Sequence, residues 1–505
     1  MNTRFTFAVL FCLATLIGQA QGEGEPLVKP VGEKLNHEGA VNAVALSPEG
    51  KFLATGGADK RVHVWDIAKG KEIGESPALK GAIHALAFAP DSKTLVSGSA
   101  DKTVRIWQID PVKELQKFEA KDGAVNAVAY SSDAKLIASG GADKLIHIWD
   151  PDKGVEVRSL KGHENGVTAL AFSPTGKRIV SGSKDRTVRV WDVDGSKESF
   201  QYLVHQGWVL SVAFAPDGQT VASSSRDQSI IFFDVVSQRK TLRVQTYEGA
   251  IPAIAFSPDG KVLASAGKDQ KVHFWDLFTG KDTYQVAGLK TGLSAVAFSK
   301  IGNILAAGGD DGSAAAWDAN GLLKIVGPHK EELNAKDLTR LWSALGDEGD
   351  QASYRAVQTL VANPKKAFEY LGDQLKAPEA LDRDRIASFV KNLGSADFDV
   401  REKATEELLR GGELVEKYLH DALKNKPLSA EAKTRVEQIL RVMETRTKEG
   451  ESNRRQMALE ILERIGTPEA KDMLKALAGG PAELEITKHA KTSLERFAHR
   501  AEAKP

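Results

Sequence analysis

The stretch GGADKRVHVWD, residues 56–66, recurs with variations along the first two thirds of the chain. The later copies read GSADKTVRIWQ, GGADKLIHIWD, GSKDRTVRVWD, SSRDQSIIFFD, AGKDQKVHFWD and GGDDGSAAAWD. One aromatic residue closes each copy and returns at steps of 42 residues: Trp65, Trp107, Trp149, Trp191, Phe233, Trp275 and Trp317. Spacing without a single insertion or deletion predicts seven copies of one structural unit.

Each copy has the pattern of four short β-strands. In the first copy, the apolar residues 41–46 and 52–55 are separated by a Ser-Pro-Glu-Gly turn, and a third strand is expected at residues 62–65. A further turn and a short polar strand follow. A unit of about 40–45 residues that contains a Trp-Asp pair resembles a blade of the WD40-repeat family. The resemblance implies a seven-bladed β-propeller, which we place at residues 27–326.

A terminal strand must complete the last blade, because an open ring would leave an unpaired strand edge. In the WD40 family the N-terminal strand does this, and the resemblance implies that residues 31–35 do so here. Residues 322–326, which follow the last copy, are an alternative that the sequence does not exclude.

An aspartate lies six residues before each aromatic residue, in a turn whose backbone N–H groups it can cap. In WD40 proteins this Asp also orients a His, and a Ser or Thr links that His to the Trp. The seven turn aspartates are Asp59, Asp101, Asp143, Asp185, Asp227, Asp269 and Asp311. The resemblance implies complete networks in blades 1 and 4, formed by His37, Thr55, Asp59 and Trp65, and by His163, Ser181, Asp185 and Trp191.

The other blades depart from this pattern. Blade 5 has His205, Ser223 and Asp227 but places Phe233 where the Trp belongs. The remaining blades replace the loop His and are expected to have incomplete networks: Leu79, Lys121, Tyr247 and Leu289.

These residue types also occur in hydrolase triads, but a catalytic triad occurs once whereas this set recurs, so we interpret it as structural. The recurring residues His63, His147 and His273 are likewise interpreted as repeat positions and not as metal ligands. The sequence contains no GxxxxGK[ST] loop and no HExxH motif. We therefore predict a non-enzymatic protein that needs no metal and no cofactor.

Residues 1–20 have the pattern of a secretory signal peptide, with Arg4 before an apolar run at residues 5–17 and a small-residue cleavage site at its end. We therefore expect an exported protein, periplasmic or secreted. Cys12 is the only cysteine and lies in this segment, so the mature chain would have no disulfide bond. The 68 basic and 68 acidic residues balance, which argues against nucleic acid as a partner. No later apolar run is long enough to span a membrane.

Residues 330–505 are rich in Ala, Leu, Glu, Lys and Arg, and their apolar residues follow a helical period. Short amphipathic segments predict helices joined by short loops. Phrases such as ASFVKNLGSADFDVREKATEELL resemble HEAT-like repeats, which implies helix pairs stacked side by side. A helical bundle with another connectivity remains open.

The residues before the first strand and around the turn Asp should face one side of the propeller, where binding residues gather on loops. Trp208 stands where the other blades have Ala or Gly. Four basic residues of blades 4 to 6 are expected around it: Lys184, Arg186, Arg226 and Lys268. We predict a monomeric interaction scaffold that binds a protein or peptide on this face, and the basic residues favour an acidic or carboxylate-bearing one. The alternative is a small-ligand or glycan sensor in which Trp208 stacks on a sugar at the mouth of the propeller channel.

Overall fold

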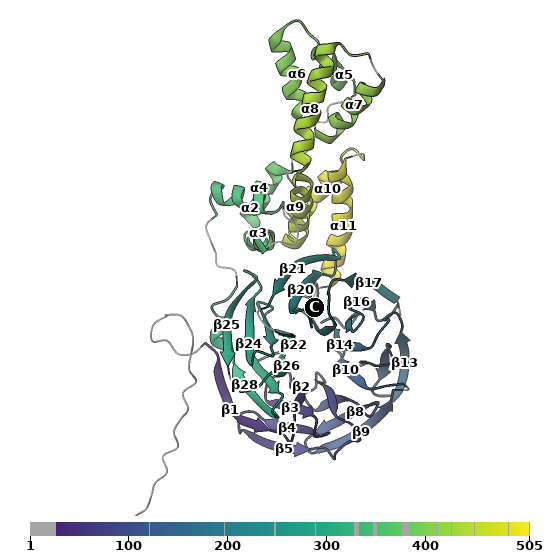
Figure 1. Ribbon diagram of the computed structural model, residues 1–505, viewed down its shortest axis with the longest axis vertical. Helices are drawn as coiled ribbons and strands as arrows, with labels where there is room; N and C mark the ends of the chain where they lie inside the picture. Colours follow the sequence, from purple (N-terminus) through teal and green to yellow (C-terminus); the bar gives the residue numbers. More distant parts are fainter. Residues whose placement is uncertain are drawn as a thin grey trace, which may run out of the picture.

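The computed structural model describes residues 27–503, except residues 121, 196, 247–248, 288, 328–332, 347–350, 376–382, 411, 426, 449 and 483. The predicted signal peptide lies outside the described residues. Seven four-stranded antiparallel sheets surround a central axis, and a helical region extends from one side of the ring (Figure 1). The predicted seven-bladed propeller followed by a helical region is therefore confirmed.

Six blades each consist of four consecutive strands. Blade 1 contains β2 (Val41–Leu46), β3 (Phe52–Gly57), β4 (Val62–Asp66) and β5 (Lys71–Glu75). Blade 2 contains β6 (Ile83–Phe88), β7 (Thr94–Ser99), β8 (Thr103–Ile109) and β9 (Val112–Glu119). Blade 3 contains β10 (Val125–Tyr130), β11 (Ile137–Gly141), β12 (Ile146–Asp150) and β13 (Val155–Leu160).

The second half of the ring repeats this order. Blade 4 contains β14 (Val167–Phe172), β15 (Arg178–Ser183), β16 (Thr187–Asp192) and β17 (Lys197–Leu203). Blade 5 contains β18 (Val209–Phe214), β19 (Thr220–Ser225), β20 (Ser229–Asp234) and β21 (Arg239–Gln245). Blade 6 contains β22 (Ala253–Phe256), β23 (Val262–Ala266), β24 (Lys271–Asp276) and β25 (Lys281–Ala287). Blade 7 contains β26 (Leu293–Phe298), β27 (Ile304–Gly309), β28 (Ser313–Asp318) and the N-terminal strand β1 (Lys29–Asn36).

The ring is closed by the N-terminal strand. β1 pairs antiparallel with β28, and this ladder aligns Val31 with Ala316 and Leu35 with Ala314. The alternative at residues 322–326 does not form a strand, because the chain enters the short helix α1 (Asn320–Leu323) directly after β28. Both ends of the propeller sequence therefore belong to one sheet, which leaves no gap in the ring.

The glycines of the repeated stretch permit close packing between blades. A Cβ atom built on Gly56 would lie 2.7 Å from the Ile83 side chain of blade 2. The same relation joins Gly98 to Val125, at 2.7 Å, and Gly182 to Val209, at 2.5 Å. Cβ atoms do not approach that closely, so a side chain at these positions would push the blades apart.

Polar side chains of the innermost strands also join neighbouring blades. The Asn42 side chain donates a 3.0 Å hydrogen bond to the Ile83 carbonyl, and Asn126 donates one of the same length to the Val167 carbonyl. In both cases the acceptor begins the first strand of the next blade. These bonds fix the height of each blade against its neighbour.

The C-terminal region is helical, as predicted, and contains α2 (Ala335–Ala344), α3 (Gln351–Ala362), α4 (Pro364–Gln374), α5 (Arg383–Asn392), α6 (Phe398–Arg410), α7 (Gly412–Asn425), α8 (Ala430–Lys448), α9 (Glu451–Ile465), α10 (Pro468–Ala478) and α11 (Glu485–Ala503). Within the described part of the chain, no helix is long and apolar enough to cross a membrane.

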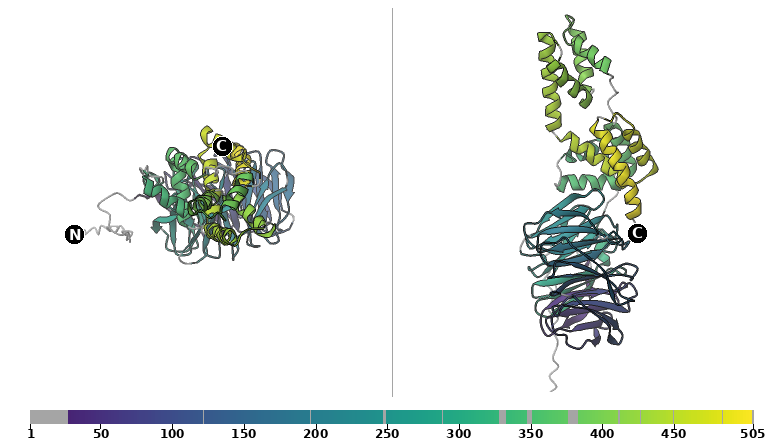
Figure 2. Two further views of the ribbon diagram at one scale, coloured as in Figure 1. Left: turned by 90° about the horizontal axis from the view of Figure 1, so that it is seen from above. Right: turned by 90° about the vertical axis from the view of Figure 1, so that its right-hand side faces the viewer.

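These helices form two clusters that do not follow chain order. Helices α2, α3 and α4 pack with α9, α10 and α11 around one hydrophobic core, which we call the base. Helices α5 to α8 surround a second core, which we call the arm. The base adjoins the propeller and the arm projects beyond it (Figures 1 and 2). The consecutive stacking of helix pairs that the HEAT-like resemblance implied is therefore wrong for the base, where the last three helices return to the first three.

The base is attached to blades 5 and 6 by specific hydrogen bonds. The Tyr354 hydroxyl donates to the Leu277 carbonyl at 2.5 Å, and the Gln351 amide donates to the Gly280 carbonyl at 2.8 Å. Arg500 of α11 donates to the Gln219 side chain at 2.7 Å. All three propeller partners lie in loops at the same end of the strands, so the base docks on one end of these two blades.

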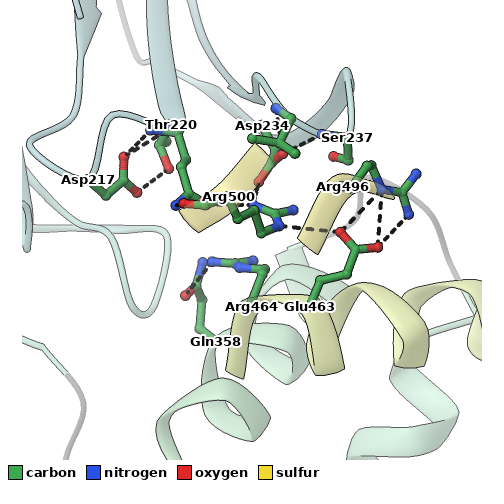
Figure 3. A network of polar contacts seen from close by, with 11 residues as sticks. Asp217, Thr220, Asp234, Ser237, Gln358, Glu463, Arg464, Arg496 and Arg500 are labelled. Carbon is green, nitrogen blue, oxygen red and sulfur yellow. Dashed lines mark hydrogen bonds and ion pairs between the residues drawn. The ribbon is translucent and has the colours of Figure 1, made fainter. Parts of the chain in front are cut away.

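A buried ion pair lies at the centre of this contact (Figure 3). The Arg500 guanidinium donates to an Asp234 carboxylate oxygen at 2.8 Å and to Glu463 of α9 at 3.3 Å. The side chains of Arg500 and Asp234 are 5% and 6% exposed. Burial works against the charge of Asp234, but the adjacent Arg500 outweighs it and holds the pKa of this carboxyl below its usual value.

We predict that Arg500→Ala separates the unfolding of the base from that of the propeller. The substitution leaves the Asp234 carboxylate buried without its counter-ion, which should cost about 3 kcal/mol. Differential scanning calorimetry should then show the base unfolding at a lower temperature, relative to the propeller, than it does in the native chain. Arg496→Ala is the matched control, because Arg496 binds Glu463 at 2.6 Å inside the base. If both variants shifted the unfolding of the base by the same amount, the ion pair between Arg500 and Asp234 would not be what couples the base to the propeller.

Candidate functional site

Trp208, Lys184 and Arg226 lie at one end of blades 4 and 5. Trp208 directly precedes β18, Arg226 lies in the turn before β20, and Lys184 lies in the equivalent turn before β16. The Arg226 backbone N–H donates to the Trp208 carbonyl at 2.9 Å, which holds the Trp loop against the turn. The structure therefore brings together three of the five residues predicted for binding, and we call them the Trp208 site.

The Trp208 ring is flanked by two cations and is still open to solvent. The Lys184 ammonium lies 5.0 Å from the ring centroid, and the Arg226 guanidinium carbon lies 5.3 Å from it. Each such contact contributes about 0.5–1 kcal/mol at an exposed site. Trp208 is 41% exposed, which leaves much of this large aromatic surface available to a partner.

The other two predicted residues are placed differently. Lys268 is paired with Asp310 of blade 7, with its ammonium 2.8 Å from the carboxylate, and it also contacts the Ser294 hydroxyl at 3.3 Å. Its ammonium is therefore directed toward blade 7, and a role for Lys268 in binding beside Trp208 stays a prediction. Arg186 is exposed in the same turn as Lys184, at a positive φ of 72°.

The helical base leaves this site uncovered. Strand β18 runs from the Trp208 end to the loop that contains Gln219, which contacts Arg500. Strand β20 runs in the same sense, from the turn of Arg226 to Asp234, the partner of Arg500. The Trp208 site and the base therefore lie at opposite ends of the blade 5 strands.

The hydrogen-bond networks behind this face have the geometry that the WD40 resemblance implied. In blade 1, His37 contacts Asp59 at 2.8 Å and Thr55 at 2.5 Å, and the Trp65 indole donates to Thr55 at 2.7 Å. In blade 4 the corresponding distances are 2.8 Å for His163–Asp185, 2.7 Å for His163–Ser181 and 2.8 Å for Trp191–Ser181.

Blade 5 keeps the first part of this network. His205 lies 3.1 Å from Asp227 and 2.8 Å from Ser223. Phe233 has no N–H to donate, and it stacks on Tyr202 with ring centroids 4.3 Å apart. In this blade aromatic packing takes the place of the indole hydrogen bond.

In three of the four blades that lack the loop His, a His or Arg on the third strand binds the turn Asp instead. In blade 3, His147 lies 2.8 Å from Asp143 and 2.7 Å from Glu156 of the outer strand. In blade 6, His273 lies 2.7 Å from Asp269 and 2.8 Å from Asp282.

Blade 2 uses Arg105, which contacts Asp101 at 3.4 Å and Glu114 at 2.5 Å. The Trp indoles of these three blades still donate to a serine of the second strand, at 2.8 to 2.9 Å: Trp107 to Ser97, Trp149 to Ser139 and Trp275 to Ser265. In blade 7, Asp311 accepts from Ser313 at 2.5 Å, and Trp317 is buried beside Leu305 and Ala307.

That a third-strand His or Arg would bind the turn Asp was not predicted from the sequence, although the spacing of acidic residues indicates it. An acid follows the third-strand His or Arg at a separation of nine residues in four blades: His63 and Glu72, Arg105 and Glu114, His147 and Glu156, His273 and Asp282. This spacing places the two side chains on neighbouring strands of one face. Lys121 and Tyr247, which replace the loop His in blades 3 and 6, lie outside the described residues.

Blade 1 also holds groups with metal-ligand chemistry, His37, Asp59 and His63, with Glu72 and Glu75 beside them. The His63 ring lies 2.9 Å from Asp59 and 2.6 Å from Glu72, which are direct hydrogen-bond distances. Burial, followed by the charge of His63, lowers the pKa of His37. The same pairs recur in blades 3 and 6, so a structural role accounts for this geometry.

The Ser–His–Asp sets are inaccessible to a substrate. Ser181 is fully buried, and its hydroxyl is already engaged by His163 and Trp191. A nucleophile must face a space that can hold the reacting atom. This arrangement therefore stabilises the blade and does not form a hydrolytic centre.

We predict that His273 is an imidazolium at neutral pH. Burial opposes its charge, but hydrogen bonds to Asp269 and Asp282 raise its pKa from 6.5 to about 9. Since the folded state binds this proton more tightly, the resulting stabilisation is complete below pH 6.5 and is lost as the pH rises through about 9. An NMR titration should find this pKa, and Asp282→Asn should lower it. Titration of His273 near 6.5 in the native chain would refute the ion pair.

Two family models match the propeller. The model described as WD domain, G-beta repeat matches residues 29–66 and 73–108, and the model described as IFT122 first beta-propeller matches residues 124–341. No curated protein matches the chain. The matched segments include strands of all seven blades, and the structure shows the repeated His–Ser–Trp contacts in the blades where the sequence supplies them. The chain therefore contains a seven-bladed WD40 β-propeller, joined to a C-terminal helical region.

Proposed function

We propose that this protein is an exported, non-enzymatic scaffold that binds a protein or peptide at the Trp208 site. WD40 propellers serve in general as protein-interaction scaffolds, and the family is typically non-enzymatic. The observation that carries the proposal is the exposed Trp208 ring held between Lys184 and Arg226. Aromatic and Arg side chains supply most of the binding energy at protein interfaces.

The charges at the site favour an acidic segment as the partner. Lys184 and Arg226 flank the ring, and the exposed Arg186 stands in the same turn as Lys184. Lys268 does not add to this charge, because Asp310 pairs with it. A partner that sets an apolar side chain on Trp208 and carboxylates beside it would therefore match both features of the site.

The position of the base is consistent with this function. Because it docks at the opposite ends of the blade 5 strands, a partner can reach Trp208 without displacing any helix. Export rests on the sequence pattern of residues 1–20. A monomer suits this arrangement, since the closed ring already pairs the two ends of the propeller.

We predict that Trp208→Ala removes partner binding while leaving the fold intact. Four other blades carry Ala at this position, Ala40, Ala82, Ala124 and Ala250, so the loop accepts it. Loss of an interface Trp typically costs about 2 kcal/mol or more, which is roughly a 30-fold weaker affinity. The measurement is affinity capture from the native envelope fraction, followed by titration of the captured protein.

Arg226→Glu should weaken capture further at low salt, because it reverses one of the two flanking charges. Lys144→Glu is the charge-matched control, since Lys144 occupies a turn of blade 3. Unchanged capture by both Trp208→Ala and Arg226→Glu would rule out this face. Thermal stabilisation of the native chain by a sugar, lost in Trp208→Ala, would instead establish the glycan-sensor alternative.

A further inference from the structure

The helical region consists of two compact bodies with separate cores. The base is centred on residues such as Leu360, Leu371 and Leu462, and the arm on residues such as Leu408, Leu419 and Val436. Among the described residues the two cores share no side chain. Each body is packed internally, so neither needs the other to bury its apolar surface.

The base is fixed to the propeller, whereas the arm extends away from it. Arg500 pairs with Asp234, and Tyr354 donates to the Leu277 carbonyl, so base and propeller form one unit. The arm is held together by its own contacts, for example the 2.8 Å ion pair between Arg435 of α8 and Glu402 of α6. In the side view the arm stands beyond the base, away from the ring (Figure 2).

Two residues separate the last helix of the arm from the first returning helix of the base, and the second of them is Gly450. Helix α8 ends at Lys448 and α9 begins at Glu451, with Gly450 as the residue before α9. Gly450 has φ 76° and ψ 19°, which is the left-handed conformation. Only glycine adopts this conformation without a steric penalty, and glycine also reaches many other backbone angles at little cost.

Gly450 also lies where no side chain fits. A Cβ atom at this position would be 2.9 Å from the Gly346 carbonyl oxygen and 3.1 Å from the Gly346 Cα. The α9 helix is anchored next to this point, because Asn453 donates to the same Gly346 carbonyl at 3.3 Å. The start of α9 is therefore fixed in the base, and a change in the direction of the arm would have to occur at or before Gly450.

We propose that Gly450 is a hinge about which the arm turns as a rigid body relative to the unit formed by the base and the propeller. A few residues at the end of a helix that absorb a change in φ and ψ are the usual site of such motions. The hinge concerns the chain alone and does not depend on a partner at the Trp208 site. Its consequence is that the distance from the arm to the propeller varies while each body keeps its shape.

Distance measurements between pairs of spin labels on the full chain test the hinge. Cys12 is the only native cysteine, so Cys12→Ser gives a chain into which label sites can be introduced singly. One pair joins arm to base, Lys433→Cys with Lys491→Cys. Two control pairs lie within rigid units: Lys403→Cys with Lys433→Cys in the arm, and Lys491→Cys with Lys281→Cys across base and propeller. All four lysines are exposed.

The arm-to-base distance distribution should be at least about twice as wide as either control distribution, because a hinge samples several orientations. Gly450→Ala should shift or narrow it, since Ala disfavours the left-handed conformation. Gly466→Ala is the matched control: Gly466 has φ 71°, ends α9 inside the base and has open space at its Cβ position. The control pairs report whether each variant is folded.

Two outcomes would overturn the proposal. The first is an arm-to-base distribution as narrow as the controls in the native chain, which would mean that the arm and the base form one rigid body. The second is a wide distribution that Gly450→Ala leaves unchanged, which would place the pivot elsewhere. The first measurement needs no glycine variant, so a narrow distribution would refute the hinge even if Gly450→Ala fails to fold.

Discussion

Pairing of the N-terminal strand β1 with β28 is the constraint on which the propeller depends. Without it blade 7 would have three strands and an exposed edge, and the ring would be open between blades 1 and 7. Because β1 and β28 come from opposite ends of the propeller sequence, closure links the first residues of the domain to the last. The seven blades can then be packed tightly against one another, with Gly308 of blade 7 against Val41 of blade 1 as in the other blade contacts.

Blade 5 departs from the repeat at several positions, and it also binds the base. It has Phe233 in place of Trp, Ser224 in place of the packed glycine, and Trp208 before its first strand. Ser224 compensates by donating to the Ile251 carbonyl of blade 6 at 2.9 Å. The same blade binds the base through Asp234 at the opposite end of its strands. The base contact uses a residue of the repeat, since Asp234 follows the repeated aromatic just as Asp192 and Asp276 do, whereas Trp208 and Ser224 are departures from the repeat.

The turn aspartates show why only part of the candidate site could be predicted. The sequence identifies all seven, because their spacing from the aromatic residue is constant. Their partners vary: His37 comes from a loop before the blade, His147 and His273 come from the third strand, and Arg105 serves blade 2. Likewise Lys184 and Arg226 could be placed near Trp208 from the blade register. The same register brings Lys268 beside Asp310 of the next blade, but the sequence does not show that the two side chains form an ion pair, since that depends on their conformations.

The sequence by itself determined the number of blades, their strand order, the helical character of the C-terminal region and the position of Trp208 as an outlier. These features are local or periodic, and a 42-residue repeat displays them seven times. Only the tertiary structure decided which strand closes the ring, how the helices divide into base and arm, and that Arg500 meets Asp234 across 266 residues of chain. Contacts between separately folded parts of the chain depend on how those parts dock against each other. No local pattern records such a position, because complementary shape and charge select it only after each body has folded.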